Sequence, residues 1–130
     1  MDYKILGWLN VIILGVLITP FIMVRLNKYV FKTKNKNYLE ITKKFRKIHK
    51  PLGIALVGSS IYHGYLALGA IRLHTGTVLF AAIAFTVIIG GVYYRKKKKN
   101  SFYTHKIMAV VVIVLLLIHL FYPYAFSKLL

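Results

Sequence analysis

Two stretches of the sequence, HKPLGIALVGSSIYH at residues 49–63 and HKIMAVVVIVLLLIH at residues 105–119, each begin and end with a histidine. Both stretches lie in long, mostly apolar segments. Fourteen steps of an α-helix, at about 100° each, bring the second side chain back to within roughly 40° of the first. The same steps rise about 21 Å along the helix axis. Each stretch therefore predicts a helix with two imidazoles on one face, near opposite sides of a bilayer.

The composition indicates a membrane protein. The chain has 130 residues, 58% of them hydrophobic, and uncharged runs of about 20 residues are typical of transmembrane helices. One helical domain is expected over residues 1–130. The absence of cysteine excludes disulfides, iron–sulfur clusters, thiolate zinc sites and covalently attached c-type haem. The net charge is +17, and most of the positive residues lie between the apolar runs. Membrane topology and binding of anionic lipid therefore explain the charge better than a nucleic-acid partner.

Four membrane spans are predicted, and they form an all-α, four-helix transmembrane bundle. They cover about residues 5–24, 49–71, 76–94 and 104–126. A signal peptide is the alternative for the first run, but its length, its following positive charges and its lack of a small-residue cleavage site favour a retained helix. Pro20 predicts a kink or an early exit from this helix, and Pro51 is placed in the first turn of the second span. The basic connection at residues 25–50 is either an amphipathic surface helix or a solvated linker.

The loop charges predict the orientation. The first connection holds ten Lys and Arg residues and the third, at residues 95–99, holds five. By the positive-inside rule both connections are cytoplasmic, and both termini are extracytoplasmic. The chain is then a multi-pass protein of the cell membrane, and its second and fourth spans run parallel.

Parallel spans place the histidines at two depths. His49 and His105 lie near the cytoplasmic face, and His63 and His119 lie about 21 Å further out. If the two helices face each other across the bundle, the first pair would hold an inner haem and the second pair an outer haem. A bis-histidine b-type haem needs two neutral imidazoles on its iron, and its wide apolar ring fills the interior of a bundle.

The haem propionates would need cations at each interface. Arg46, Lys50 and Lys106 are the inner candidates, and Arg72 is the outer one. His74, in the short outer loop, could assist electron exit, bind a substrate or metal, or touch a propionate. A solvated loop residue is the favoured interpretation of His74, and no catalytic residue is assigned.

Other interpretations of these residues remain open. A single intramembrane histidine could hydrogen-bond to a neighbouring helix, and a zinc or proton-relay site is an alternative to haem. No Asp or Glu lies within any span, which argues against a proton-translocating carboxylate. Gly76 and Gly90 are also 14 residues apart. They either allow a flat cofactor to approach the backbone or serve ordinary helix packing, and packing is slightly favoured.

The paired histidines resemble those of the di-haem membrane cytochrome b group, in particular the four-helix core of the cytochrome b of quinol–cytochrome c oxidoreductases. The run His49-Lys50-Pro51-Leu52-Gly53, followed by His63-Gly64, is similar to the ferric-reductase-like transmembrane domain and to cytochrome b561-type proteins. The resemblance covers about 75 residues, from the second span to the fourth. It implies that His49, His63, His105 and His119 are axial ligands of two non-covalent b-type haems.

The departures from these families are informative as well. We expect neither the flavin- and nicotinamide-binding region of ferric reductases nor the extra helices that build quinone sites. The resemblance thus implies transmembrane electron transfer from a cytoplasmic flavoprotein or quinol to an extracytoplasmic acceptor, with a redox partner protein or quinone at each end. The alternatives are a non-redox channel-like, holin-like or assembly subunit, and a single-haem cytochrome. The oligomeric state is left open.

Overall fold

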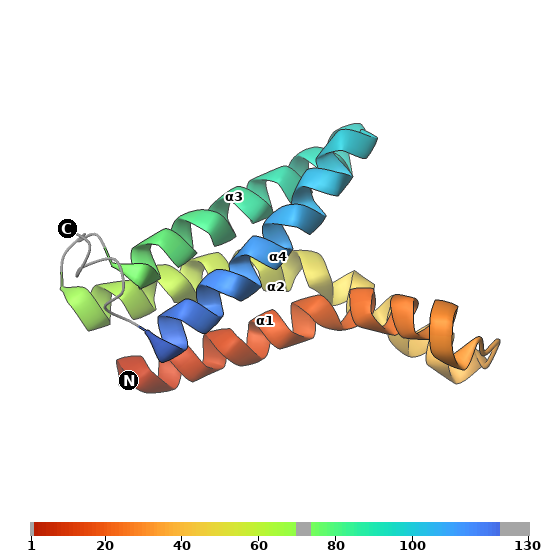
Figure 1. Ribbon diagram of the computed structural model, residues 1–130, viewed down its shortest axis with the longest axis horizontal. Helices are drawn as coiled ribbons and strands as arrows, with labels where there is room; N and C mark the ends of the chain where they lie inside the picture. Colours follow the sequence, from red (N-terminus) through yellow and green to blue (C-terminus); the bar gives the residue numbers. More distant parts are fainter. Residues whose placement is uncertain (1, 70–73, 123–130) are drawn as a thin grey trace. The chain divides into compact units, whose positions relative to one another are not determined.

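The computed structural model describes residues 2–69 and 74–122, and these residues are almost entirely helical. The elements in chain order are α1 (Tyr3–Leu26), the π-helix η1 (Asn27–Phe31), α2 (Lys36–Leu68), α3 (Thr75–Lys96) and α4 (Lys99–Phe121), drawn in Figure 1. No strand occurs within these two described ranges, so the predicted all-α class is confirmed. The chain divides into two compact units, Met1–Ser59 and Ser60–Leu130.

Three helices are long and apolar enough to cross a membrane: Tyr3–Phe31, Thr75–Lys96 and Lys99–Phe121. They confirm the first, third and fourth predicted spans as apolar helices. The second predicted span lies in α2, which does not reach the same apolar content over its described residues. The ends of the second and fourth predicted spans, at residues 70–71 and 123–126, lie outside the described residues. The second span, the four-helix arrangement and the orientation stay predictions.

The first helix ends later than predicted. Asp2 caps it by accepting a hydrogen bond from the Lys4 N–H at 3.2 Å. The early exit at Pro20 is wrong, because α1 continues through this proline to Leu26. A proline removes only one backbone hydrogen bond, and long apolar helices in membranes tolerate that loss.

The second helix begins earlier than predicted. It starts at Lys36 and runs for 33 residues, so Pro51 lies in its interior rather than in its first turn. Residues 36–50 include five lysines together with Leu39, Glu40 and Arg46, all of which favour helix, so the segment before Pro51 is helical on its own. The helical interpretation of the basic connection is therefore confirmed from Lys36 onward.

Hydrogen bonds join α1 to the part of α2 that belongs to the first unit. The Tyr38 hydroxyl donates to the Met23 carbonyl, and the Ser59 hydroxyl donates to the Asn10 side chain. Because the later residues of α1 pair with the earlier residues of α2, the two segments run antiparallel (Figure 1). Only Thr42, Gly53 and Leu56 of this α2 segment are buried.

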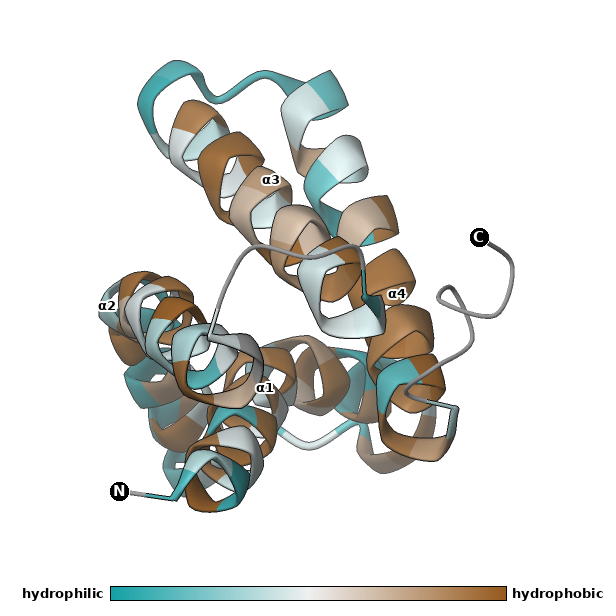
Figure 2. Cartoon of the chain, turned by 90° about the vertical axis from the view of Figure 1, so that its left-hand side faces the viewer, coloured by the Kyte–Doolittle hydropathy of each residue, from teal (hydrophilic) through white to brown (hydrophobic). Residues whose placement is uncertain are grey.

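In the second unit, α3 and α4 form an antiparallel hairpin. Lys97 turns the chain with a left-handed φ of 55°, and its N–H donates to the Tyr93 carbonyl at 2.7 Å. Figure 2 shows hydrophobic residues along both helices and hydrophilic residues at their connection. The buried residues of this hairpin are Thr75, Leu79, Ala82 and Ile83 of α3 and Val112 of α4. Other large apolar side chains, such as Ile88 at 62% exposure, remain uncovered, as expected for helices that face lipid.

Candidate functional site

The two histidines of α4 both hydrogen-bond to α3. The Nδ1 atom of His105 lies 2.9 Å from the Thr86 carbonyl oxygen. The Nδ1 atom of His119 lies 2.9 Å from the Thr75 hydroxyl oxygen. Both rings are half-buried. The prediction that the 14-residue spacing places these two imidazoles on one helix face is confirmed.

Each of these rings packs against a glycine of α3. A Cβ atom added to Gly90 would lie 2.9 Å from Cε1 and 3.0 Å from Nδ1 of His105. A Cβ atom added to Gly76 would lie 3.1 Å from Cε1 of His119. The favoured interpretation of these glycines as helix-packing residues is confirmed, and each leaves the space in which an imidazole of α4 sits.

The predicted outer pair lies close together within the second unit. The ring centres of His63, on α2, and His119 are 6.5 Å apart, and their planes are at 88°. A metal–imidazole bond is about 2 Å long, so two rings on opposite sides of one metal atom have centres about 6 Å apart. The observed separation and angle are those of an edge-to-face contact, and the separation would also suit two imidazoles that bind one metal atom.

The inner histidines carry a matching feature on two different helices. The Nδ1 atom of His49 lies 3.0 Å from the Leu17 carbonyl oxygen of α1, just as that of His105 lies beside the Thr86 carbonyl. A carbonyl oxygen only accepts, so Nδ1 carries the proton in both rings. In the neutral imidazole the lone pair is then on Nε2, which is the tautomer that a metal-ligating histidine adopts when its other nitrogen is held.

His49 and His105 lie in different units of the chain. His49 belongs to the first unit and His105 to the second. Their assignment to one inner site therefore stays a prediction.

The fifth histidine does not lie in a solvated loop. His74 is the N-cap of α3, where its Nδ1 accepts a hydrogen bond from the Gly76 N–H at 3.3 Å. Its half-buried ring has its centre 5.9 Å from that of His119. An N-cap side chain satisfies a backbone donor that the helix cannot pair, so His74 has a structural role beside the outer pair.

The four propionate candidates are distributed unevenly. Arg46 lines a hollow in the first unit, and Lys50 is exposed on α2. The ammonium of Lys106 lies 4.2 Å from the ring centre of Phe102, a cation–π contact. Arg72 lies outside the described residues.

The sequence pattern does not predict the supporting roles of Thr75, Thr86 and the Leu17 carbonyl. The sequence does contain one indication for Thr86. It precedes Gly90 by four residues, so its carbonyl lies next to the helix surface that the glycine leaves uncovered. Within the described ranges, no group of three or more His, Cys, Asp or Glu side chains could hold a metal ion. A bis-histidine haem requires only two protein ligands.

Comparison of the chain with known protein families, with curated proteins and with solved structures gave no match.

Proposed function

We propose that the chain is a small membrane cytochrome b that carries electrons across the bilayer through two bis-histidine haem sites. The observation that carries the proposal is the repeated support of the α4 histidines by α3. His105 and His119 each have Nδ1 in a hydrogen bond and each pack on a glycine, 14 residues apart on both helices. The proximity of His63 to His119 supports the pairing of helices that the outer site requires.

In this proposal His63 and His119 hold the outer haem, and His49 and His105 hold the inner one. When bound, haem supplies an iron that gains and loses one electron. The residues of this chain hold each imidazole in place, and the Leu17 and Thr86 carbonyls fix the orientation of the inner rings and the proton on their Nδ1 atoms. The apolar helices keep water away from both sites.

The proposal includes the four-span topology, with the basic connections on the cytoplasmic side and both termini outside. A cytoplasmic flavoprotein or a membrane quinol would donate electrons at the inner site. An extracytoplasmic protein or small molecule would accept them at the outer site. The basic inner surface favours an acidic donor protein, because opposite charges steer association.

The decisive experiment is spectroscopic. The chain, expressed with sufficient haem and purified in detergent, should show a b-type α-band in its reduced-minus-oxidised spectrum and contain two haems per chain. A ratio near one would favour a single-haem cytochrome. Colourless, folded protein would favour a non-redox membrane subunit and would sink the proposal.

Removal of the Thr75 hydroxyl should weaken the outer site alone. The Thr75→Val substitution keeps the side-chain shape but loses the hydrogen bond to His119. Loss of such a supporting partner lowers metal-site affinity by about 10-fold or more. Haem titration of the apoprotein should show one weakened site of two. Thr104→Val is the matched control, since its hydroxyl bonds only within α4, to the Asn100 carbonyl. Equal effects of the two substitutions would contradict the assigned role of Thr75.

A further inference from the structure

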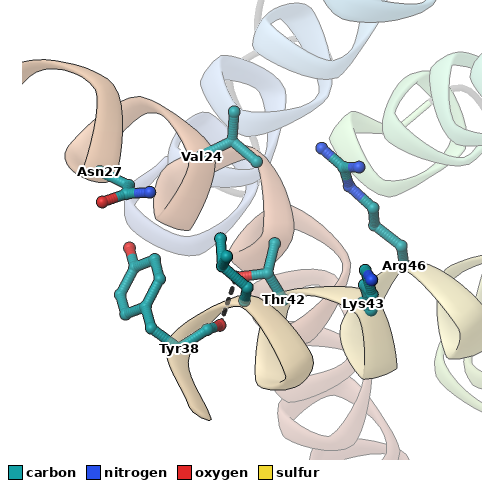
Figure 3. Close-up of a pocket in the computed structure, with 7 residues that line it drawn as sticks. Val24, Asn27, Tyr38, Thr42, Lys43 and Arg46 are labelled. Atoms are coloured by element: carbon teal, nitrogen blue, oxygen red, sulfur yellow. Dashed lines mark hydrogen bonds between the residues drawn. The ribbon is translucent and has the colours of Figure 1, made fainter. Parts of the chain in front are cut away.

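A hollow of about 290 Å³ lies in the first unit, where the end of α1 and η1 face the first turns of α2. Figure 3 shows Val24 and Asn27 on one side of it and Lys43 and Arg46 rising from α2 on the other. It is lined by Val24, Asn27, Tyr38, Leu39, Thr42, Lys43 and Arg46. The hollow thus combines apolar side chains with two cations.

Hydrogen bonds within the first unit engage the hydroxyls of Tyr38 and Thr42 in the walls of the hollow. The Tyr38 hydroxyl donates to the Met23 carbonyl at 2.6 Å, and the Thr42 hydroxyl donates to the Tyr38 carbonyl at 2.9 Å. The Asn27 side-chain oxygen accepts from the Thr33 N–H at 2.7 Å. That bond fixes the carboxamide so that its NH₂ group remains a donor for something else.

The two cations have no anion of their own. The whole chain holds two acids, Asp2 and Glu40, against 19 Lys and Arg residues. Asp2 caps α1 at its far end. Neither Lys43 nor Arg46 forms an ion pair with any residue in the described ranges, and Glu40 does not line the hollow. An anionic partner of these two cations is therefore not found among the described residues.

If the segment Tyr3–Phe31 crosses the membrane, the hollow lies at the depth of the lipid headgroups. The apolar segment Tyr3–Phe31, which is long enough to cross a membrane, ends beside it. The first turns of α2 expose Leu39, Ile41 and Ile48 at 41%, 46% and 40% among lysines. A basic helix with exposed apolar residues is typical of a segment that lies in the membrane interface.

We propose that this hollow binds the phosphate of an anionic phospholipid headgroup, with Lys43, Arg46 and the Asn27 NH₂ group as its donors. Arginine and lysine are the side chains that bind phosphate oxygens most strongly, and Val24 and Leu39 would contact the adjoining glycerol and acyl carbons. The proposal does not depend on haem, because it rests on residues of the first unit that precede His49.

The test compares two double variants with the same loss of charge. Lys43→Gln with Arg46→Gln removes the cations of the hollow, and Lys44→Gln with Lys47→Gln removes two neighbours that do not line it. Native mass spectrometry of the full chain in detergent would measure binding of palmitoyl-oleoyl phosphatidylglycerol, with the phosphatidylcholine analogue as the neutral probe. The first pair removes two charge-assisted hydrogen bonds to the phosphate, so it should weaken one phosphatidylglycerol site by roughly tenfold or more. The control pair should weaken it by about threefold at most.

A second variant guards against a folding artefact. Asn27→Asp keeps the oxygen that accepts from Thr33 but replaces the donor with a negative charge, so it should also lose the tight lipid. Equal losses in both double variants would show general charge attraction and overturn the proposal. Displacement of the lipid by inorganic phosphate in excess would do the same, because the site would then recognise free anion. The haem spectrum of the same samples separates this outcome from failure of the proposed function.

Discussion

A chain with His119→Ala is expected to bind one haem instead of two, and a chain with His63→Ala is expected to lose the same one. The two rings lie 6.5 Å apart between centres, so each would supply one axial nitrogen to a shared site. Removal of either ligand would leave the outer site with one nitrogen and a cavity, and we expect this weakened site to lose its haem during purification. The inner site should keep its spectrum and its midpoint potential.

The shared site also predicts non-additivity. The double variant His63→Ala with His119→Ala should lose no more haem than either single variant, because residues that act in one site are not independent. The measurement is the haem-to-protein ratio with a redox titration, in which one of two components disappears. His74→Ala is the control: its ring lies 5.9 Å from that of His119, yet it should cost only an N-cap, about 1 kcal/mol of stability, and leave both haems. Loss of different haems in the two single variants would refute the cross-pairing.

The helices and the faces of the histidines could be predicted from the sequence, because both depend on local periodicity. A 14-residue spacing fixes the relative direction of His105 and His119 whatever surrounds the helix. Apolar length likewise identified the segments now seen in α1, α3 and α4. These features require no knowledge of which residues meet across helices.

The helix ends and the supporting contacts could not be predicted in the same way. The spacing predicts a helix start at Pro51, but α2 begins at Lys36 because the basic segment before the proline is itself helical. His74 was assigned to a loop, although it lies one residue before Thr75 and caps α3. The Leu17 and Thr86 carbonyls are backbone groups, which have no sequence signature, and only the approach of a second helix selects them.

Replacement of Gly90 by alanine is expected to remove the inner haem and to destabilise the protein, although alanine has the higher helix propensity. Alanine in place of glycine normally stabilises a helix by about 0.5–1 kcal/mol. At this position the new Cβ would lie 2.9 Å from Cε1 and 3.0 Å from Nδ1 of His105. The ring can move away only by giving up its hydrogen bond to the Thr86 carbonyl, so the ligand and its tautomer are disturbed together.

The neighbouring glycine provides a control of the same chemistry. A Cβ on Gly91 would meet nothing within 4 Å, so Gly91→Ala should keep both haems and raise the thermal stability slightly. Gly90→Ala should lower the free energy of unfolding by about 1–3 kcal/mol, the usual cost of an overpacked contact. Thermal unfolding in detergent and the haem ratio would measure both effects.

Gly76 extends the comparison to the outer site. Its added Cβ would lie 3.1 Å from Cε1 of His119, a contact that a shift of a few tenths of an ångström relieves. Gly76→Ala should therefore weaken the outer haem without removing it, whereas Gly90→Ala removes the inner one. Loss of both haems in either variant would mean that the glycines maintain the packing of α3 and α4 as a whole. An effect confined to the outer haem in Gly76→Ala and to the inner haem in Gly90→Ala would tie each glycine to the imidazole that it faces.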